Sequence, residues 1–180
     1  MRILSVCSKE EVYRHWEQVD RFKNCPHVAV WRKRIWSPLP ADIRWYNAEI
    51  EDEDLKRIFI ISSDEWCCLS RTFKLMDVAG EVAKRADNEI VCRIHDLIGR
   101  FKENPESLDR KLTMVSPSFE GNFTVIDGNK RAVVLHSIGE LAGNRIYLGI
   151  SEKIVDYRWA ERAMSDPNTA KNLYDAAHTN

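Results

Sequence analysis

The stretch KLTMVSPSFEGNFTVIDGNKRAVVLHSIGELAGNRIYLGIS, from Lys111 to Ser151, decides the fold class of this chain of 180 residues. Its first part predicts a strand over KLTMVSPS, a turn at EGN and a second strand over FTVID. RAVVLHSIGELAGN is typical of a helix that ends near Gly143, and RIYLGIS of a third strand. Strands joined both by a tight turn and by a helix predict an α/β (α+β) domain with a small mixed sheet and flanking helices.

Helices are expected on both sides of this stretch. SKEEVYRHWEQVDRF begins with Ser8 as a capping residue and places Val12 and Trp16 on one face. NEIVCRIHDLIGRFKENP has a continuous apolar stripe and a proline just past its end, which is the clearest helix pattern in the chain. RIFII predicts a strand, SSDEWCCLS a short helix, and EKIVDYRWAERAM a helix near the C-terminal end.

The chain is interpreted as a single domain with three parts. Residues 86–155 form the core, residues 1–85 a helical N-terminal elaboration, and residues 156–180 a C-terminal helix and tail. This division follows the density of alternating strands and helices, which is greatest between residues 112 and 150.

Composition limits the classes of function. The chain has 27 basic and 28 acidic residues, for a net charge of -1, so bulk electrostatic binding of nucleic acid is not favoured. No apolar run is long enough for a membrane span, and the start lacks a signal-peptide pattern, so we expect a cytoplasmic protein without a membrane partner. The five cysteines and five histidines do not have the spacing of metal ligands, and we expect no metal site built by protein side chains alone.

The joint between the second strand and the following helix contains five polar or flexible residues, Asp127 to Arg131. The first amides of a helix have no partner within the helix, and the helix dipole is positive there. A phosphate would bind these amides, and two adjacent cations would add charge. The predicted phosphate-binding residues are Gly128, Asn129, Lys130 and Arg131.

A purely structural interpretation of the same residues remains open. Asp-Gly is a common turn dipeptide, and either Asp127 or Asn129 could cap the helix. Cations at a helix start are unfavourable for helix stability, however, which favours an anionic ligand. A P-loop is excluded, because its glycine and lysine pattern does not occur.

The stretch resembles the core of the ParB/sulfiredoxin-like superfamily over residues 109–155. Asp127, Gly128 and Arg131 match the D-G-x-x-R turn of that superfamily as they stand. The resemblance implies a ParB/sulfiredoxin-like core in which the turn and helix start hold nucleotide phosphates. It also implies activities such as nucleotide hydrolysis, ATP-dependent phosphorylation of free serine, and ATP-dependent repair of oxidised cysteine.

Three differences between this sequence and members of the superfamily reduce the number of activities that we expect. The catalytic cysteine that sulfiredoxin carries in this turn is missing, which argues against sulfinic-acid repair. The long DNA-binding helical part of partition proteins has no counterpart in the residues after Ser151. Asn129 stands where the serine kinases have a histidine, and asparagine cannot act as an acid or base at neutral pH.

The sequence therefore predicts a nucleotide-binding protein, as an ATP-dependent kinase (phosphotransferase) or a nucleotide hydrolase using ATP or CTP with Mg²⁺. Lys130 and Arg131 would neutralise phosphate charge, Asp127 would hold Mg²⁺ or position a hydroxyl, and Glu49 would act as the base. The acceptor, a small molecule or a protein, stays open.

Two other functions remain as alternatives. The first is a non-catalytic ParB-like regulatory module that binds a nucleotide or nucleic acid. The second is a protein-interaction domain in which the turn has only a structural role.

Overall fold

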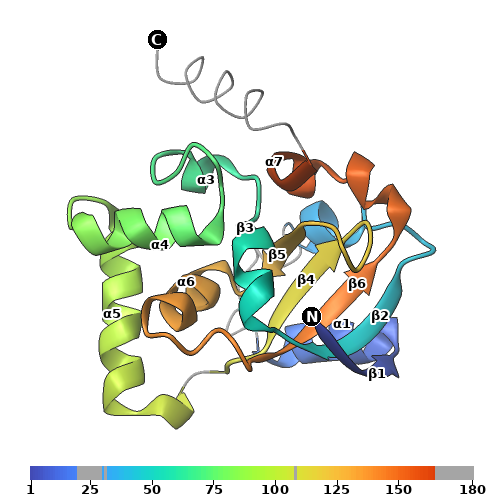
Figure 1. The fold of residues 1–180 in the computed structure, drawn as a ribbon, viewed down its shortest axis with the longest axis horizontal. Coiled ribbons are helices and arrows are strands. Elements are labelled where there is room, and N and C mark those ends of the chain that lie inside the picture. The colour runs from blue at the N-terminus through green and yellow to red at the C-terminus, as the bar shows by residue number, and fades with distance from the viewer. Residues whose placement is uncertain (20–29, 31, 108, 165–180) are drawn as a thin grey trace.

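A computed structural model describes residues 1–19, 30, 32–107 and 109–164, and shows a sheet of six strands flanked by helices (Figure 1). The strands lie in the order β1-β2-β6-β4-β5-β3. Their bounds are β1 Arg2–Cys7, β2 Arg44–Glu49, β3 Ile58–Ile60, β4 Leu112–Ser116, β5 Phe123–Asp127 and β6 Arg145–Ile150. The pairs β4–β6 and β3–β5 are parallel and the others antiparallel, which confirms the expected mixed sheet.

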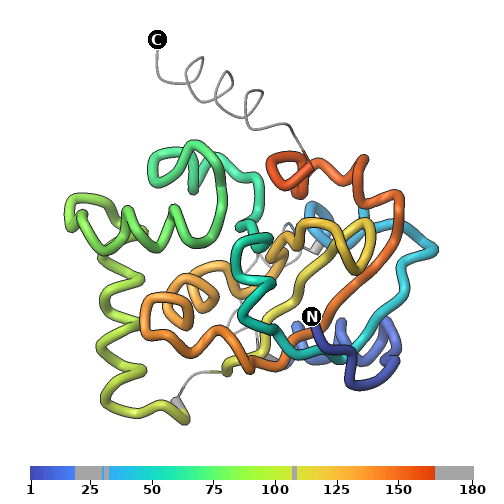
Figure 2. The backbone as a smooth tube through the Cα atoms, viewed as in Figure 1, coloured from blue at the N-terminus to red at the C-terminus, as the bar shows by residue number. Residues whose placement is uncertain are grey.

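The helices pack around this sheet. α4, α5 and α6 contact one another beside its β3–β5 side, whereas α1 lies against β2 (Figures 1 and 2). Their bounds are α1 Lys9–Val19, α3 Asp64–Cys67, α4 Leu75–Lys84, α5 Glu89–Glu103, α6 Asn129–Ser137 and α7 Glu161–Met164. Shorter turns are the π-helix η1 Arg32–Trp36 and the 3-10 helices η2 Asp52–Arg57, η3 Pro105–Ser107, η4 Glu152–Asp156 and η5 Arg158–Ala160. None of the helices in the described ranges is long and apolar enough to cross a membrane.

The first 85 residues contribute more to the sheet than the sequence pattern predicts. They supply β1, β2 and β3, so half of the strands come from the part expected to be a helical elaboration. α6 ends at Ser137, earlier than expected, because Gly139 takes a left-handed backbone conformation with φ 76°. The helix expected over EKIVDYRWAERAM divides into η4, η5 and α7.

Because of the strand directions, the connection from β5 to α6 and the connection from α6 to β6 lie at the same edge of the sheet. Because β5 is antiparallel to β4 and β4 is parallel to β6, β5 ends where β4 and β6 begin. The turn at residues 127–131, the residues just before β4 and the start of β6 therefore lie along the same edge, which we call the turn edge. β3 also ends at the turn edge, since it is parallel to β5.

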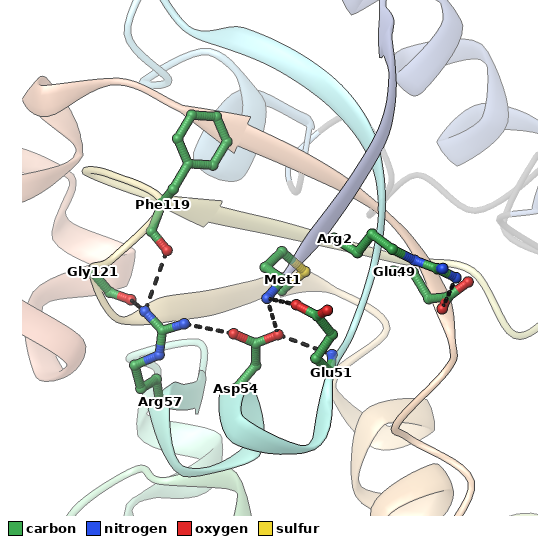
Figure 3. A network of polar contacts seen from close by, with 8 residues as sticks. All are labelled: Met1, Arg2, Glu49, Glu51, Asp54, Arg57, Phe119 and Gly121. Carbon is green, nitrogen blue, oxygen red and sulfur yellow. Dashed lines mark hydrogen bonds and ion pairs between the residues drawn. The ribbon is translucent and has the colours of Figure 1, made fainter.

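A buried polar cluster joins the start of β1 to η2 (Figure 3). Asp54 is fully buried, and its two carboxylate oxygens lie 2.5 Å from the Met1 amine and 2.5 Å from Arg57 Nη2. Arg57 also donates to the carbonyl oxygens of Phe119 and Gly121 at 3.3 and 3.2 Å. One carboxylate of the acidic run at residues 49–54 therefore has a structural role.

Candidate functional site

The N-cap residue of α6 is a glycine. Gly128 takes φ 85° and ψ 25°, a left-handed conformation that few other residues adopt cheaply. Its carbonyl oxygen accepts the first helical hydrogen bond, from the Ala132 amide at 2.8 Å. Gly128, as the N-cap residue, has no side chain to cap this helix, and the first turn contains no acidic residue. The helix start therefore has the electrostatic character of an anion site.

Arg131 closes the turn on itself. Its Nη1 donates to Asp109 Oδ2 at 2.6 Å and to the Asp109 carbonyl oxygen at 3.0 Å, and its Nη2 donates to Asp127 Oδ2 at 2.9 Å. The guanidinium packs over Gly128, where an added Cβ would lie 3.1 Å from Arg131 Nε. The D-G-x-x-R turn thus forms a clamp in which Asp127 and Arg131 bind each other. Arg131 was predicted to bind phosphate, but its charge is already matched by two carboxylates.

The electrostatics of Asp109 maintain this clamp. Burial opposes the ionisation of Asp109, but the polar contact with His15, the hydrogen bond from the Lys111 amide and the charge of Arg131 outweigh it and lower the pKa to about 2. His15 Nε2 lies 3.6 Å from Asp109 Oδ2. Asp109 is therefore ionised at neutral pH and remains a partner of Arg131.

Lys130 and Asn129 face the segments that follow β3. Lys130 Nζ lies 2.7 Å from Glu65 Oε1 and 5.8 Å from the centre of the Trp66 ring. Asn129 Oδ1 accepts a hydrogen bond from the Ile61 amide at 3.0 Å. The ion pair of Lys130 is partly exposed and of the weak surface kind, so an incoming phosphate could replace Glu65.

Two buried polar atoms near these segments have no hydrogen-bond partner in the part of the chain that the structure describes. They are Ser63 Oγ and Arg162 Nη1. Ser63 lies two residues beyond Ile61, whose amide donates to Asn129 in α6, and the Arg162 amide donates to Ser62 Oγ at 3.0 Å, so Arg162 lies beside the segment that contacts the start of α6. Buried polar atoms are nearly always paired, so these two atoms are candidates to bind a group from outside the chain.

The structure does not bring Glu49 and Asp127 together. Glu49 ends β2, which β6 and β4 separate from β5. It forms an ion pair with Arg2, and its cross-strand neighbour is Arg145. Sequence reasoning missed Ser63 and Arg162, since neither belongs to a motif and Arg162 follows the turn by 31 positions (162 − 131).

No group of three or more His, Cys, Asp or Glu side chains within residues 1–19, 30, 32–107 and 109–164 is arranged to hold a metal ion. Comparisons with protein families, curated proteins and solved structures find no match. The ParB/sulfiredoxin-like resemblance therefore rests on the turn motif and its neighbouring strands, and it stays a prediction.

Proposed function

We propose that the protein binds a nucleotide through its phosphates at the start of α6. The observation that carries this proposal is a helix start with a glycine N-cap, in contact with the segment that follows β3, where the buried Ser63 Oγ and, beside that segment, Arg162 Nη1 have no hydrogen-bond partner among the described residues. A phosphate group offers several acceptor oxygens and could bind both atoms together with the helix amides.

Arg162, not Arg131, is the guanidinium assigned to the phosphates in this proposal. Arg131 would have to leave both Asp109 and Asp127, which would leave two carboxylates unpaired. Arg162 forms no ion pair with any described residue, and it lies over the Phe73 ring at 5.2 Å. Lys130 would exchange Glu65 for phosphate and supply the second cation.

The reaction proposed is phosphoryl transfer or nucleotide hydrolysis, with ATP or CTP as the nucleotide and Mg²⁺ supplied with it. Mg²⁺ would offset phosphate charge when bound, and the chain's own residues would orient the phosphates in line with the acceptor. Asp127 acts here by fixing the turn through Arg131. Glu65, once released by Lys130, is a carboxylate at the same helix start that could accept a proton from the attacking hydroxyl or water.

Isothermal titration with ATP, CTP and GTP, each with Mg²⁺, tests this proposal. We expect at least one nucleotide to bind, and Arg162→Gln to weaken it by about 10- to 100-fold, the scale of one charged hydrogen bond. Arg158→Gln, which removes a nearby arginine from η5, is the matched control and should leave the affinity unchanged. Folded wild-type protein that binds none of the three nucleotides would contradict the proposal.

Release of inorganic phosphate distinguishes catalysis from the non-catalytic alternative. Nucleotide binding without turnover, with or without candidate acceptors, would favour a regulatory module that uses the same phosphate contacts.

A further inference from the structure

A second candidate site is a cavity along the turn edge, lined by none of the residues assigned to the phosphates above. Its volume is about 660 Å³, within the range of small-molecule sites. Residues 109–111, before β4, form one side, and the loop at residues 139–145, before β6, forms the other. Three cations line it, Arg110, Lys111 and Arg145.

Lys111 and Arg145 are neighbours on adjacent strands. Leu112 pairs with Ile146 in the parallel register of β4 and β6, so the residues just before them, Lys111 and Arg145, lie side by side. Like charges in this arrangement repel and destabilise a sheet unless an anion compensates them.

The hydrogen bond and the ring contact of Lys111 are with neutral side chains. Lys111 Nζ donates to Asn47 Oδ1 at 2.8 Å and lies 3.8 Å from the centre of the Tyr147 ring. Neither Lys111 nor Arg145 forms an ion pair with a residue in the described ranges. The side chain of Lys111 is half-buried, and burial lowers its pKa; the charges of Glu11, Cys7 and Asp109 oppose this shift, and that of Arg145 adds to it.

The nearby carboxylates are already bound to other groups. Asp109 pairs with Arg131, and Glu140 pairs with Arg110 at 2.6 Å. Glu49, opposite Arg145 across the strands, pairs with Arg2. Glu11 accepts a hydrogen bond from the Tyr147 hydroxyl at 3.4 Å. Two adjacent cations therefore line an open cavity without a carboxylate in ion-pair contact.

We infer that this cavity binds a small phosphate monoester, with Lys111 and Arg145 on its phosphate. A phosphate monoester carries close to two negative charges near neutral pH, which matches the two cations. The ion pair of Arg110 with Glu140 is partly exposed, so exchanging Glu140 for the same ligand costs little. The site uses no residue of the nucleotide proposal, so either can fail without the other.

Isothermal titration with ribose 5-phosphate, inorganic phosphate and ribose tests this inference. The wild-type protein should bind both phosphates and not ribose. Arg145→Gln, at an exposed position, should fold normally and lower the affinity for ribose 5-phosphate by about 10- to 100-fold. Lys111→Met should lower this affinity at least as much. Arg93→Gln, in an exposed pair on α5, is the control and should have no effect.

Three outcomes would overturn the inference. They are folded wild-type protein that binds neither phosphate, equal affinity in the wild type and in both cavity variants, and an equal loss in Arg93→Gln. Arg162→Gln should leave ribose 5-phosphate binding intact, and a shared loss in Arg162→Gln and Arg145→Gln would mean one site rather than two.

Discussion

The turn at residues 127–131 and the cavity lined by Lys111 and Arg145 lie on the same edge of the sheet, and both gather cations. They differ in what faces those cations. In the turn, Arg131 binds two carboxylates and Lys130 a third. In the cavity, Lys111 contacts the neutral side chains of Asn47 and Tyr147, and neither Lys111 nor Arg145 forms an ion pair with a described residue. Lys130 and Arg131, which are consecutive in the turn, are both paired with carboxylates, whereas Lys111 and Arg145, which are brought together by strand register, have no carboxylate partner among the described residues.

Asp54 gives the largest expected effect among the paired clusters. Asp54→Asn leaves Arg57 and the Met1 amine without their buried carboxylate, so it should lower the free energy of unfolding by about 3–5 kcal/mol in denaturant titration. Asp52→Asn, at an exposed position in the same 3-10 helix, should change it by less than about 0.5 kcal/mol. Equal effects would remove the structural role assigned to Asp54.

Substitutions at Gly128 and Gly139 distinguish the cost of backbone strain from the cost of side-chain overlap. Gly128→Ala would place a Cβ 2.7 Å from Leu112 Cδ2 and against the Arg131 guanidinium, besides the cost of its positive φ. We expect a loss of about 2–4 kcal/mol on unfolding. Gly139 has a similar φ of 76° but nothing within 4 Å of an added Cβ, so Gly139→Ala should cost only about 1 kcal/mol. If the two variants lose the same stability, the overlap with Leu112 and Arg131 assigned to position 128 is wrong.

Arg131 and Arg145 test the comparison directly. Arg131→Met should cost about 2–3 kcal/mol of stability, because Asp109 and Asp127 lose their shared cation. Arg145→Gln should change the free energy of unfolding by less than about 0.5 kcal/mol, since no described carboxylate loses a partner. The reverse order, measured by urea unfolding, would mean that the clamp and the cavity have been assigned the wrong way round.

The pH dependence of Asp109 gives the smallest expected effect. Its pKa of about 2 in the folded chain lies below the ordinary value of 3.8, so its ionisation stabilises the fold above pH 3.8 and the benefit is lost as pH falls towards 2. At neutral pH the free energy of unfolding of the wild-type protein should be higher than that of Asp109→Asn by about 1–2 kcal/mol, a range that allows for the partial exposure of Asp109. That difference should shrink between pH 4 and pH 2. A difference that stays constant over this range would contradict the assigned pKa.

Much of the fold follows from local patterns. β4, β5 and β6 are buried runs punctuated by turns, and α5 has a complete apolar stripe, so the sequence predicts all four. β1 is mostly exposed, and its sequence shows only a short apolar run. No helix is predicted over residues 75–84, where α4 forms around Gly80, a residue that weakens a helical pattern.

The site depends on partners that local patterns do not reveal. The motif identifies the turn, but the main partner of Arg131 is Asp109, 22 positions upstream (131 − 109). Lys111 and Arg145 meet only through the parallel register of β4 and β6, which no local signal specifies. The availability of a cation for a ligand is therefore a property of the tertiary structure.

A crystal soaked in selenate, an anomalously scattering mimic of phosphate, tests the central claim most directly. The account predicts anomalous peaks beside Lys111 and Arg145 and beside the first amides of α6 near Arg162, with Arg131 still bound to Asp109 and Asp127. A peak on the Arg131 guanidinium with Asp109 displaced, or no peak at either predicted position, would contradict it.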